Sequence, residues 1–159
     1  LPNGVKGEVI EDKLYVSPPA TTYHSSTTGR LCKALMNFVD DNDLGSIYPA
    51  SVGVYFNKNM KTVVEPDWVF VAKANLAIVE KKGIYGSPDL LIEILSTNRN
   101  QDLVRKKKLY EKHQVKEFWL VDPETKNTTG YVLKGGVYGE PHLMNSEIFV
   151  HMFNATFKF

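Results

Sequence analysis

Residues 87–96 read Ser-Pro-Asp-Leu-Leu-Ile-Glu-Ile-Leu-Ser, and within this stretch the apolar run 90–95 encloses a single acid, Glu93. Turn residues precede the run, so residues 90–95 are predicted to form a strand. An isolated ionised carboxylate among such neighbours destabilises a fold by several kcal/mol unless it is paired or binds a cation. Glu93 is therefore either half of an ion pair with a buried Arg or Lys, or a ligand.

A second acid, Asp67, follows Pro66 and leads into the apolar residues 68–71. Taken alone, Asp67 could simply cap a turn after the proline. Two adjacent strands that each carry one acid at the edge of a cleft would instead form a site for a hard cation. Mg²⁺ takes one or two protein carboxylates and leaves its other positions to water and phosphate. The two acids together therefore predict that Asp67 and Glu93 are catalytic ligands of Mg²⁺ (or Mn²⁺).

The segment of about residues 98–113 is predicted to be a charged helix with four consecutive cations, residues 105–108. Consecutive helical residues point about 100° apart, so the four cannot share one face, and at least one leans toward the sheet. Lys106 shares a stripe with Tyr110, and we predict that it reaches the carboxylates to orient water or stabilise charge on phosphate. Lys107 is the rival for this role. The cations predicted to contact a phosphate backbone are Arg99, Arg105 and Lys107.

Four further residues are candidates for supporting roles: Glu8, His24, Asp89 and Tyr110. For three of them a simpler interpretation also stands. Asp89 fits a turn after Pro88, and His24 lies in a Ser- and Thr-rich segment that can cap a helix. Glu8 is an early polar residue beside a predicted strand. The chain shows no pattern typical of a Ser/His/Asp triad, a phosphate loop or a dinucleotide fingerprint.

The order of predicted elements favours a mixed α/β (α+β) fold. A hairpin is predicted over residues 7–16, a helix over 24–41, strands over 51–56, 63–72 and 90–95, and a strand over 117–121 after the charged helix. A second hairpin and a last strand follow from about residue 131. Short connections between the central strands favour a central mixed β-sheet flanked by helices, with hairpins near both ends.

Composition limits the class of protein. The chain has 159 residues, 43% hydrophobic and 23% charged, which is ordinary for one globular domain, and we expect a single domain over residues 1–159. With a net charge of +1, any attraction to nucleic acid must come from local clusters of charge. The single cysteine, Cys32, excludes an intrachain disulfide. No apolar run approaches the roughly 20 residues that span a bilayer, so we expect a cytoplasmic protein with no membrane partner.

The chain resembles the restriction-endonuclease-like family of bacterial proteins within the PD-(D/E)XK nuclease superfamily. The resemblance covers nearly the whole chain and rests on residues 64–71, 87–96, 102–110 and 115–123. The N-terminal Gly7-Glu8 and His24 ahead of the first helix also fit. The turn Glu11-Asp12 and Ser25 depart from the family's pattern, and neither departure touches the acids.

The resemblance implies a nuclease fold in which Asp67 is the first acid and Glu93 the second. In the superfamily a lysine stands two residues after the second acid, where this chain has Leu95. The family's Asp-x-x-x-Lys-x-x-x-Tyr spacing falls on Asp102, Lys106 and Tyr110. The resemblance thus implies that Lys106 replaces the missing strand lysine.

Two functions from different classes follow. The first is a Mg²⁺-dependent endonuclease that hydrolyses phosphodiester bonds in DNA, with RNA not separable from DNA by sequence. The second is a catalytically inactive nucleic-acid-binding or regulatory domain that retains the nuclease fold, which the net charge and the missing strand lysine both favour. Metal binding at Asp67 and Glu93 discriminates the two. An enzyme that cuts both strands of a duplex would also favour a homodimer.

Overall fold

The computed structural model describes residues 5–57, 61–96 and 99–159, without the side chains of residues 99–102. The first half contains β1 (Lys6–Ile10), β2 (Lys13–Ser17), α1 (Thr22–Asp41), β3 (Gly45–Pro49), β4 (Val54–Tyr55), β5 (Val63–Val64), β6 (Trp68–Ala72), the 3₁₀ helix η1 (Lys73–Ile78), β7 (Val79–Glu80) and β8 (Gly83–Tyr85). The second half contains β9 (Leu90–Ile94), α2 (Arg99–Lys112), β10 (Glu117–Val121), β11 (Asn127–Lys134), β12 (Val137–Tyr138), β13 (His142–Asn145), β14 (Glu147–Val150), η2 (His151–Phe153) and β15 (Ala155–Lys158).

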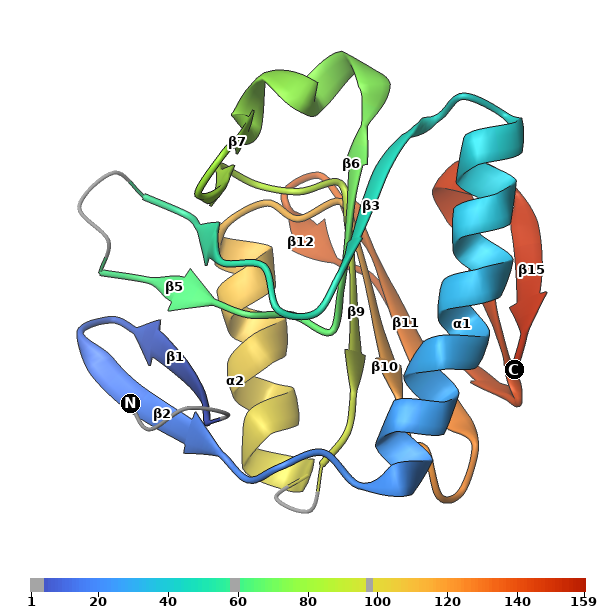
Figure 1. Cartoon of the computed structure of the whole chain (residues 1–159), viewed down its shortest axis with the longest axis horizontal. Helices are drawn as coiled ribbons and strands as arrows, with labels where there is room; N and C mark the ends of the chain where they lie inside the picture. The colour runs from blue at the N-terminus through green and yellow to red at the C-terminus, as the bar shows by residue number, and fades with distance from the viewer. Residues whose placement is uncertain (1–4, 58–60, 97–98) are drawn as a thin grey trace.

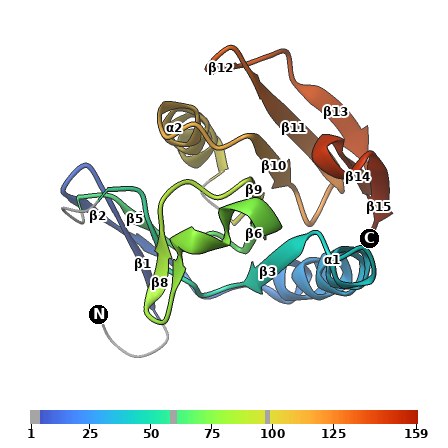
Figure 2. The same cartoon turned by 90° about the horizontal axis from the view of Figure 1, so that it is seen from above.

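The larger sheet lies between the two helices. Among the described residues it has seven strands, in the order β12-β11-β10-β9-β6-β3 with β13 beside β11. The sheet is mixed, because β9 runs parallel to β10 and antiparallel to β6. Helix α2 connects the parallel pair, as a parallel connection requires. Figures 1 and 2 show α1 and α2 on opposite faces of this sheet.

A second sheet contains the N-terminal hairpin. Its strand order is β2-β1-β5-β4-β8-β7, so β1 of the hairpin pairs with β5, a strand from the middle of the chain. Figure 1 shows β1, β2 and β5 beside α2, away from α1. Because β1 pairs with β5 and β5 pairs with β4, the N-terminal hairpin lies on the side of the larger sheet on which α2 packs.

Alternation along β9 sets which side chains face which helix. Leu90, Ile92 and Ile94 belong to one core cluster with Leu31, Leu35 and Val39 of α1. Leu91 belongs to the other cluster, with Leu109 and Tyr110 of α2. Glu93 has the same parity as Leu91 and therefore points toward α2.

Helix α1 has a clear beginning and end. Thr21 is its N-cap, and the Thr21 side chain accepts a hydrogen bond from the His24 backbone N–H at 3.2 Å. Asn42 is the C-cap, and its side chain donates to the Phe38 carbonyl at 2.8 Å. The N-cap bond satisfies a backbone donor that the first turn leaves free, and so it fixes the position of His24.

The predicted mixed sheet between helices is confirmed, and the differences lie in the short strands. Strand β3 was not predicted, because it begins at Gly45, ends at Pro49 and forms an edge, where proline is tolerated. The predicted strand over residues 51–56 is reduced to Val54–Tyr55. After the C-terminal hairpin, where one last strand was predicted, the chain forms the strands β13, β14 and β15. In the described part of the chain, no helix is long and apolar enough to cross a membrane.

Candidate active site

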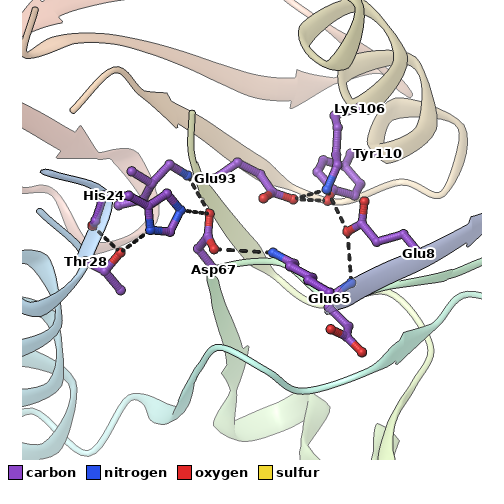
Figure 3. A network of polar contacts seen from close by, with 10 residues as sticks. Glu8, His24, Thr28, Glu65, Asp67, Glu93, Lys106 and Tyr110 are labelled. Carbon is purple, nitrogen blue, oxygen red and sulfur yellow. Dashed lines mark hydrogen bonds and ion pairs between the residues drawn. The ribbon is translucent and has the colours of Figure 1, made fainter. Parts of the chain in front are cut away.

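Glu93 on β9 is held by two side chains of α2. Lys106 Nζ donates to Glu93 Oε1 at 2.8 Å, and the Tyr110 hydroxyl donates to the same oxygen. Lys106 and Tyr110 are four residues apart, so they lie one turn apart on the face of α2 that meets the sheet. Figure 3 shows both side chains directed at Glu93. The helical stripe seen in the sequence therefore contacts the acid inside the strand.

Glu8 brings a second carboxylate to the same lysine. Lys106 Nζ donates to Glu8 Oε1 at 2.7 Å, and that oxygen also accepts the Glu65 backbone N–H at 3.0 Å. Glu8 lies on β1 and Glu93 on β9, so Lys106 joins carboxylates from the two sheets. The side chains of Glu8, Glu93 and Lys106 are all less than a tenth exposed.

Asp67 lies immediately before β6, next to the end of β9. Its Oδ2 accepts the Ile94 backbone N–H at 2.8 Å, and His24 Nε2 lies 3.3 Å from the same oxygen. The other oxygen, Oδ1, accepts from Lys6 Nζ at 3.3 Å. Thr28 donates to the His24 carbonyl at 2.8 Å, one turn along α1, and its hydroxyl lies 3.5 Å from His24 Nδ1. Asp67 is thus fixed by α1, β1 and β9 at once (Figure 3).

The surroundings drive the pKa values of the three acids apart. Burial raises the pKa of Asp67, but hydrogen bonding from His24, the charge of Lys6 and the Ile94 N–H outweigh burial and lower that pKa to about 2. Burial also raises the pKa of Glu8, and Lys106 outweighs it, so the pKa of Glu8 falls. For Glu93, burial and the neighbouring Asp67 and Glu8 charges outweigh the lysines, so its pKa is raised. Glu93 is therefore the acid that most needs a further cation to remain ionised.

The two α2 residues keep their protons. Burial lowers the pKa of Lys106, but the charges and hydrogen bonds of Glu93 and Glu8 outweigh burial and raise it. Burial and the nearby carboxylates raise the pKa of the Tyr110 hydroxyl well above its ordinary value. At neutral pH, Lys106 is a permanent ammonium and Tyr110 a permanent hydrogen-bond donor.

The three acids Glu8, Asp67 and Glu93 line one cavity of about 820 Å³, together with Lys106. Its acidic and basic lining residues are Lys6, Glu8, His24, Asp67, Glu93, Arg105 and Lys106. Less polar lining residues come from β2 and the segment after it, residues 15–20. The Arg105 guanidinium lies 3.8 Å from the ring centroid of Tyr15, and both residues line the cavity.

Most of the residues predicted from the sequence meet here. Asp67, Glu93, Lys106, Glu8, His24 and Arg105 line the cavity, and Tyr110 supports it through Glu93. Lys107 instead lies 4.7 Å above the Tyr131 ring, and Asp89 accepts from Lys116 at 2.6 Å, with neither residue in the cavity lining. The structure thus places Lys106, not its rival Lys107, beside the acids. The side chain of Arg99 lies outside the described residues.

Lys6, Thr28 and Tyr15 are site residues that the sequence did not indicate. A signal for Lys6 was present, because Lys6 and Glu8 are two apart on a strand and so project to the same face. The contact between Lys6 and Asp67, however, joins positions 61 apart in the chain. No local pattern predicts such a pairing.

The donor set fits a small divalent cation. Asp67, Glu93 and Glu8 offer carboxylate oxygens to one cavity, and oxygen ligands suit Mg²⁺ or Mn²⁺. Within the described residues, no group of three or more His, Cys, Asp or Glu side chains is arranged to hold a metal. An ion here would therefore be held by one or two carboxylates and would keep positions for water and substrate, which is usual for Mg²⁺.

The fold is a mixed sheet between two helices, with Asp67 and Glu93 at the neighbouring ends of β6 and β9 and Lys106 of the connecting helix on Glu93, and it matches a nuclease-like fold. A family model described as "Putative restriction endonuclease" (Uma2) matches residues 1–151, and the chain belongs to this family. The crystal structure of a "putative nuclease" from Anabaena variabilis is similar, with a TM-score of 0.75 and 20% sequence identity. The alignment covers 93% of this chain and 83% of that chain, which establishes the shared fold. No curated protein matches the chain.

Proposed function

We propose that this chain is a Mg²⁺-dependent (or Mn²⁺-dependent) endonuclease that hydrolyses phosphodiester bonds in DNA. The observation that carries the proposal is the meeting of Asp67, Glu93 and Lys106 in one cavity at the ends of β6 and β9. The raised pKa of Glu93 supports it, because burial and neighbouring carboxylates disfavour its charge and a bound cation would restore it. The family's description agrees with this activity.

Asp67 and Glu93 would hold the ion. Once bound, a divalent ion polarises a phosphate oxygen and lowers the pKa of a water molecule. The residues of the chain then have separate roles: Tyr110 and Lys106 orient Glu93, and His24 and the Ile94 N–H orient Asp67. In hydrolysis, the water oxygen forms a bond to phosphorus and gives up a proton to solvent, one phosphorus–oxygen ester bond breaks, and the departing oxygen takes up a proton.

Arg105 is the proposed contact to the phosphate backbone. Of the two members of the predicted set whose side chains are described, Arg105 and Lys107, Arg105 is the one that lines the cavity. Its guanidinium can donate to two oxygens of one phosphate. Since one site cuts one strand, we also propose a two-fold dimer as the unit that cuts a duplex.

The test is nicking of supercoiled plasmid, run beside calorimetric titration with Mn²⁺. Asp67→Asn and Glu93→Gln keep the shape of each side chain and remove its charge. We expect each to abolish metal binding and to lower the nicking rate by about 10²-fold or more. Lys106→Met should lower nicking by a similar factor, and EDTA should stop nicking by the wild type.

Glu140→Gln is the matched control, because Glu140 is an exposed acid outside the cavity and its loss should change neither quantity. Nicking that persists in both Asp67→Asn and Glu93→Gln would overturn the proposal. If the wild type binds DNA but neither metal nor cleavage is seen, the chain is an inactive nucleic-acid-binding domain that retains the nuclease fold.

A further inference from the structure

Two lysines reach the carboxylates of the candidate active site, and their surroundings differ. Lys106 Nζ donates to Glu8 at 2.7 Å and to Glu93 at 2.8 Å, and its side chain is 9% exposed. An ammonium group has three donors, and two of those of Lys106 are already directed at buried carboxylates. Lys6 Nζ donates to Asp67 Oδ1 at the longer distance of 3.3 Å, and its side chain is 26% exposed.

Lys6 occupies the oxygen of Asp67 that a ligand would use. Oδ2 of Asp67 already accepts the Ile94 N–H at 2.8 Å and has His24 Nε2 at 3.3 Å. Oδ1 faces Lys6. A divalent cation that binds Oδ1 therefore competes with the Lys6 ammonium for the same lone pairs, and like charges at this range repel.

Lys6 can move without a change in the backbone. It is the first residue of β1, and both Lys6 and Glu8 project from this strand into the cavity lining. A lysine ammonium sits on a flexible four-carbon stem, so it can change partners by rotation of the side chain. Lys106 has no comparable freedom, because moving its ammonium away would leave Glu8 and Glu93 buried without the hydrogen bonds that it donates to both.

We propose that Lys6 is the catalytic lysine of this site. Its ammonium holds Asp67 Oδ1 until a divalent cation binds there, and then moves to a non-bridging oxygen of the phosphate that is attacked. Lys106 is a positioning residue, which keeps Glu8 and Glu93 together. This inference rests on the proposed phosphodiester hydrolysis and assigns its substrate-facing cation.

The test compares Lys6→Met with the wild type in two measurements. In titration with Mn²⁺, Lys6→Met should bind the ion about fivefold more tightly, because a competing charge next to Asp67 has been removed. In nicking assays at saturating Mn²⁺ and plasmid, the same variant should be slower by about 10²-fold. A variant that binds metal better and cuts worse is not expected from a purely structural role. Lys6→Arg, which keeps the charge, should remain within about tenfold of the wild-type rate.

Lys13→Met is the matched control, since Lys13 is an exposed lysine of the same hairpin outside the cavity, and neither measurement should change. Nicking by Lys6→Met at the wild-type rate would overturn the role of Lys6 and leave the proposed function intact. Slower nicking with weaker metal binding would also overturn it, because Lys6 would then only hold Asp67 in place. A wild type that neither binds Mn²⁺ nor cuts would overturn the proposed function, and this assignment with it.

Discussion

Asp89 and Glu93 lie at opposite ends of one strand, and their surroundings shift their pKa values in opposite directions. Burial raises the pKa of Asp89, but hydrogen bonds from Lys116, the Ala72 N–H and Asn75 outweigh burial and lower it. For Glu93 the burial and the neighbouring acids prevail, and the pKa is raised. Asp89 therefore stabilises the fold as an anion with its own partners, whereas the positive charge around Glu93 does not offset the effect of burial and of the neighbouring acids on its pKa.

The difference predicts how Asp89→Asn responds to pH. The variant should unfold more easily by about 1–3 kcal/mol at pH 7, because two neutral donors and one ammonium lose their charged acceptor. A carboxyl group with a lowered folded-state pKa contributes stability above its unfolded pKa and loses that contribution as pH falls through the folded pKa. The difference between wild type and variant in urea unfolding should therefore be constant from pH 6 to 8 and narrow below about pH 4. An equal difference at pH 3.5 and pH 7 would contradict this account.

At the residue scale, the sequence predicted acids more readily than it predicted their partners. Glu93 stands out because a charge within an apolar strand conflicts with burial, and Lys106 follows from helical spacing relative to Tyr110. Lys6 does not, since its partner Asp67 is 61 positions away and the contact depends on how β1 joins the second sheet. Asp89 was a candidate for a supporting role, with a turn after Pro88 as the simpler interpretation, and the structure pairs it with Lys116 outside the cavity lining.

At the scale of elements, the long and periodic segments were predictable and the short strands were not. Helices α1 and α2 each show the periodicity of one packed face, and strands β9 and β10 show the short continuous apolar run of a strand buried on both faces. Strands β4, β5, β7 and β12 have two residues each, and so they carry no periodicity from which to predict them. The second sheet consists largely of such pieces, which is why its assembly around the N-terminal hairpin was not foreseen.

The packing of β10 against β11 gives a prediction about glycine. Gly130 pairs with Trp119, and a Cβ atom at Gly130 would overlap the Trp119 indole. Trp119 belongs to β10 and its side chain is fully buried in the core, so the indole cannot move aside. Gly130→Ala should therefore lower the free energy of unfolding by about 3 kcal/mol or more, measured in urea. Gly29→Ala on α1 is the matched control, because nothing lies within 4 Å of its Cβ, and it should raise stability by about 0.5–1 kcal/mol. Equal effects of the two changes would contradict the role of the Trp119 contact.

At the scale of the whole molecule, the candidate site joins segments that are distant in sequence. Glu8 comes from the second sheet, Glu93 from the larger sheet and Lys106 from the helix between them. These groups and Asp67 converge only in the folded chain, so the ion that Asp67 and Glu93 are proposed to hold would have little affinity for the unfolded chain. Binding to the folded state alone raises stability by about 2.7 kcal/mol when the ion is present at 100 times its Kd.

The melting temperature should therefore rise when Mg²⁺ or Mn²⁺ is added at pH 7.5 without DNA. For a chain of this size, that stabilisation corresponds to roughly 5–10 °C. Asp67→Asn should lose nearly all of the rise, EDTA should reverse it in the wild type, and NaCl at equal ionic strength should not reproduce it, since screening acts on all exposed charges alike. Lys6→Met should show a larger rise than the wild type at the same subsaturating Mn²⁺ concentration, because the ion no longer displaces an ammonium. If the melting temperature of Asp67→Asn rose as much as that of the wild type, the ion would bind elsewhere on the molecule. The three carboxylates Glu8, Asp67 and Glu93 in the cavity would then need another explanation.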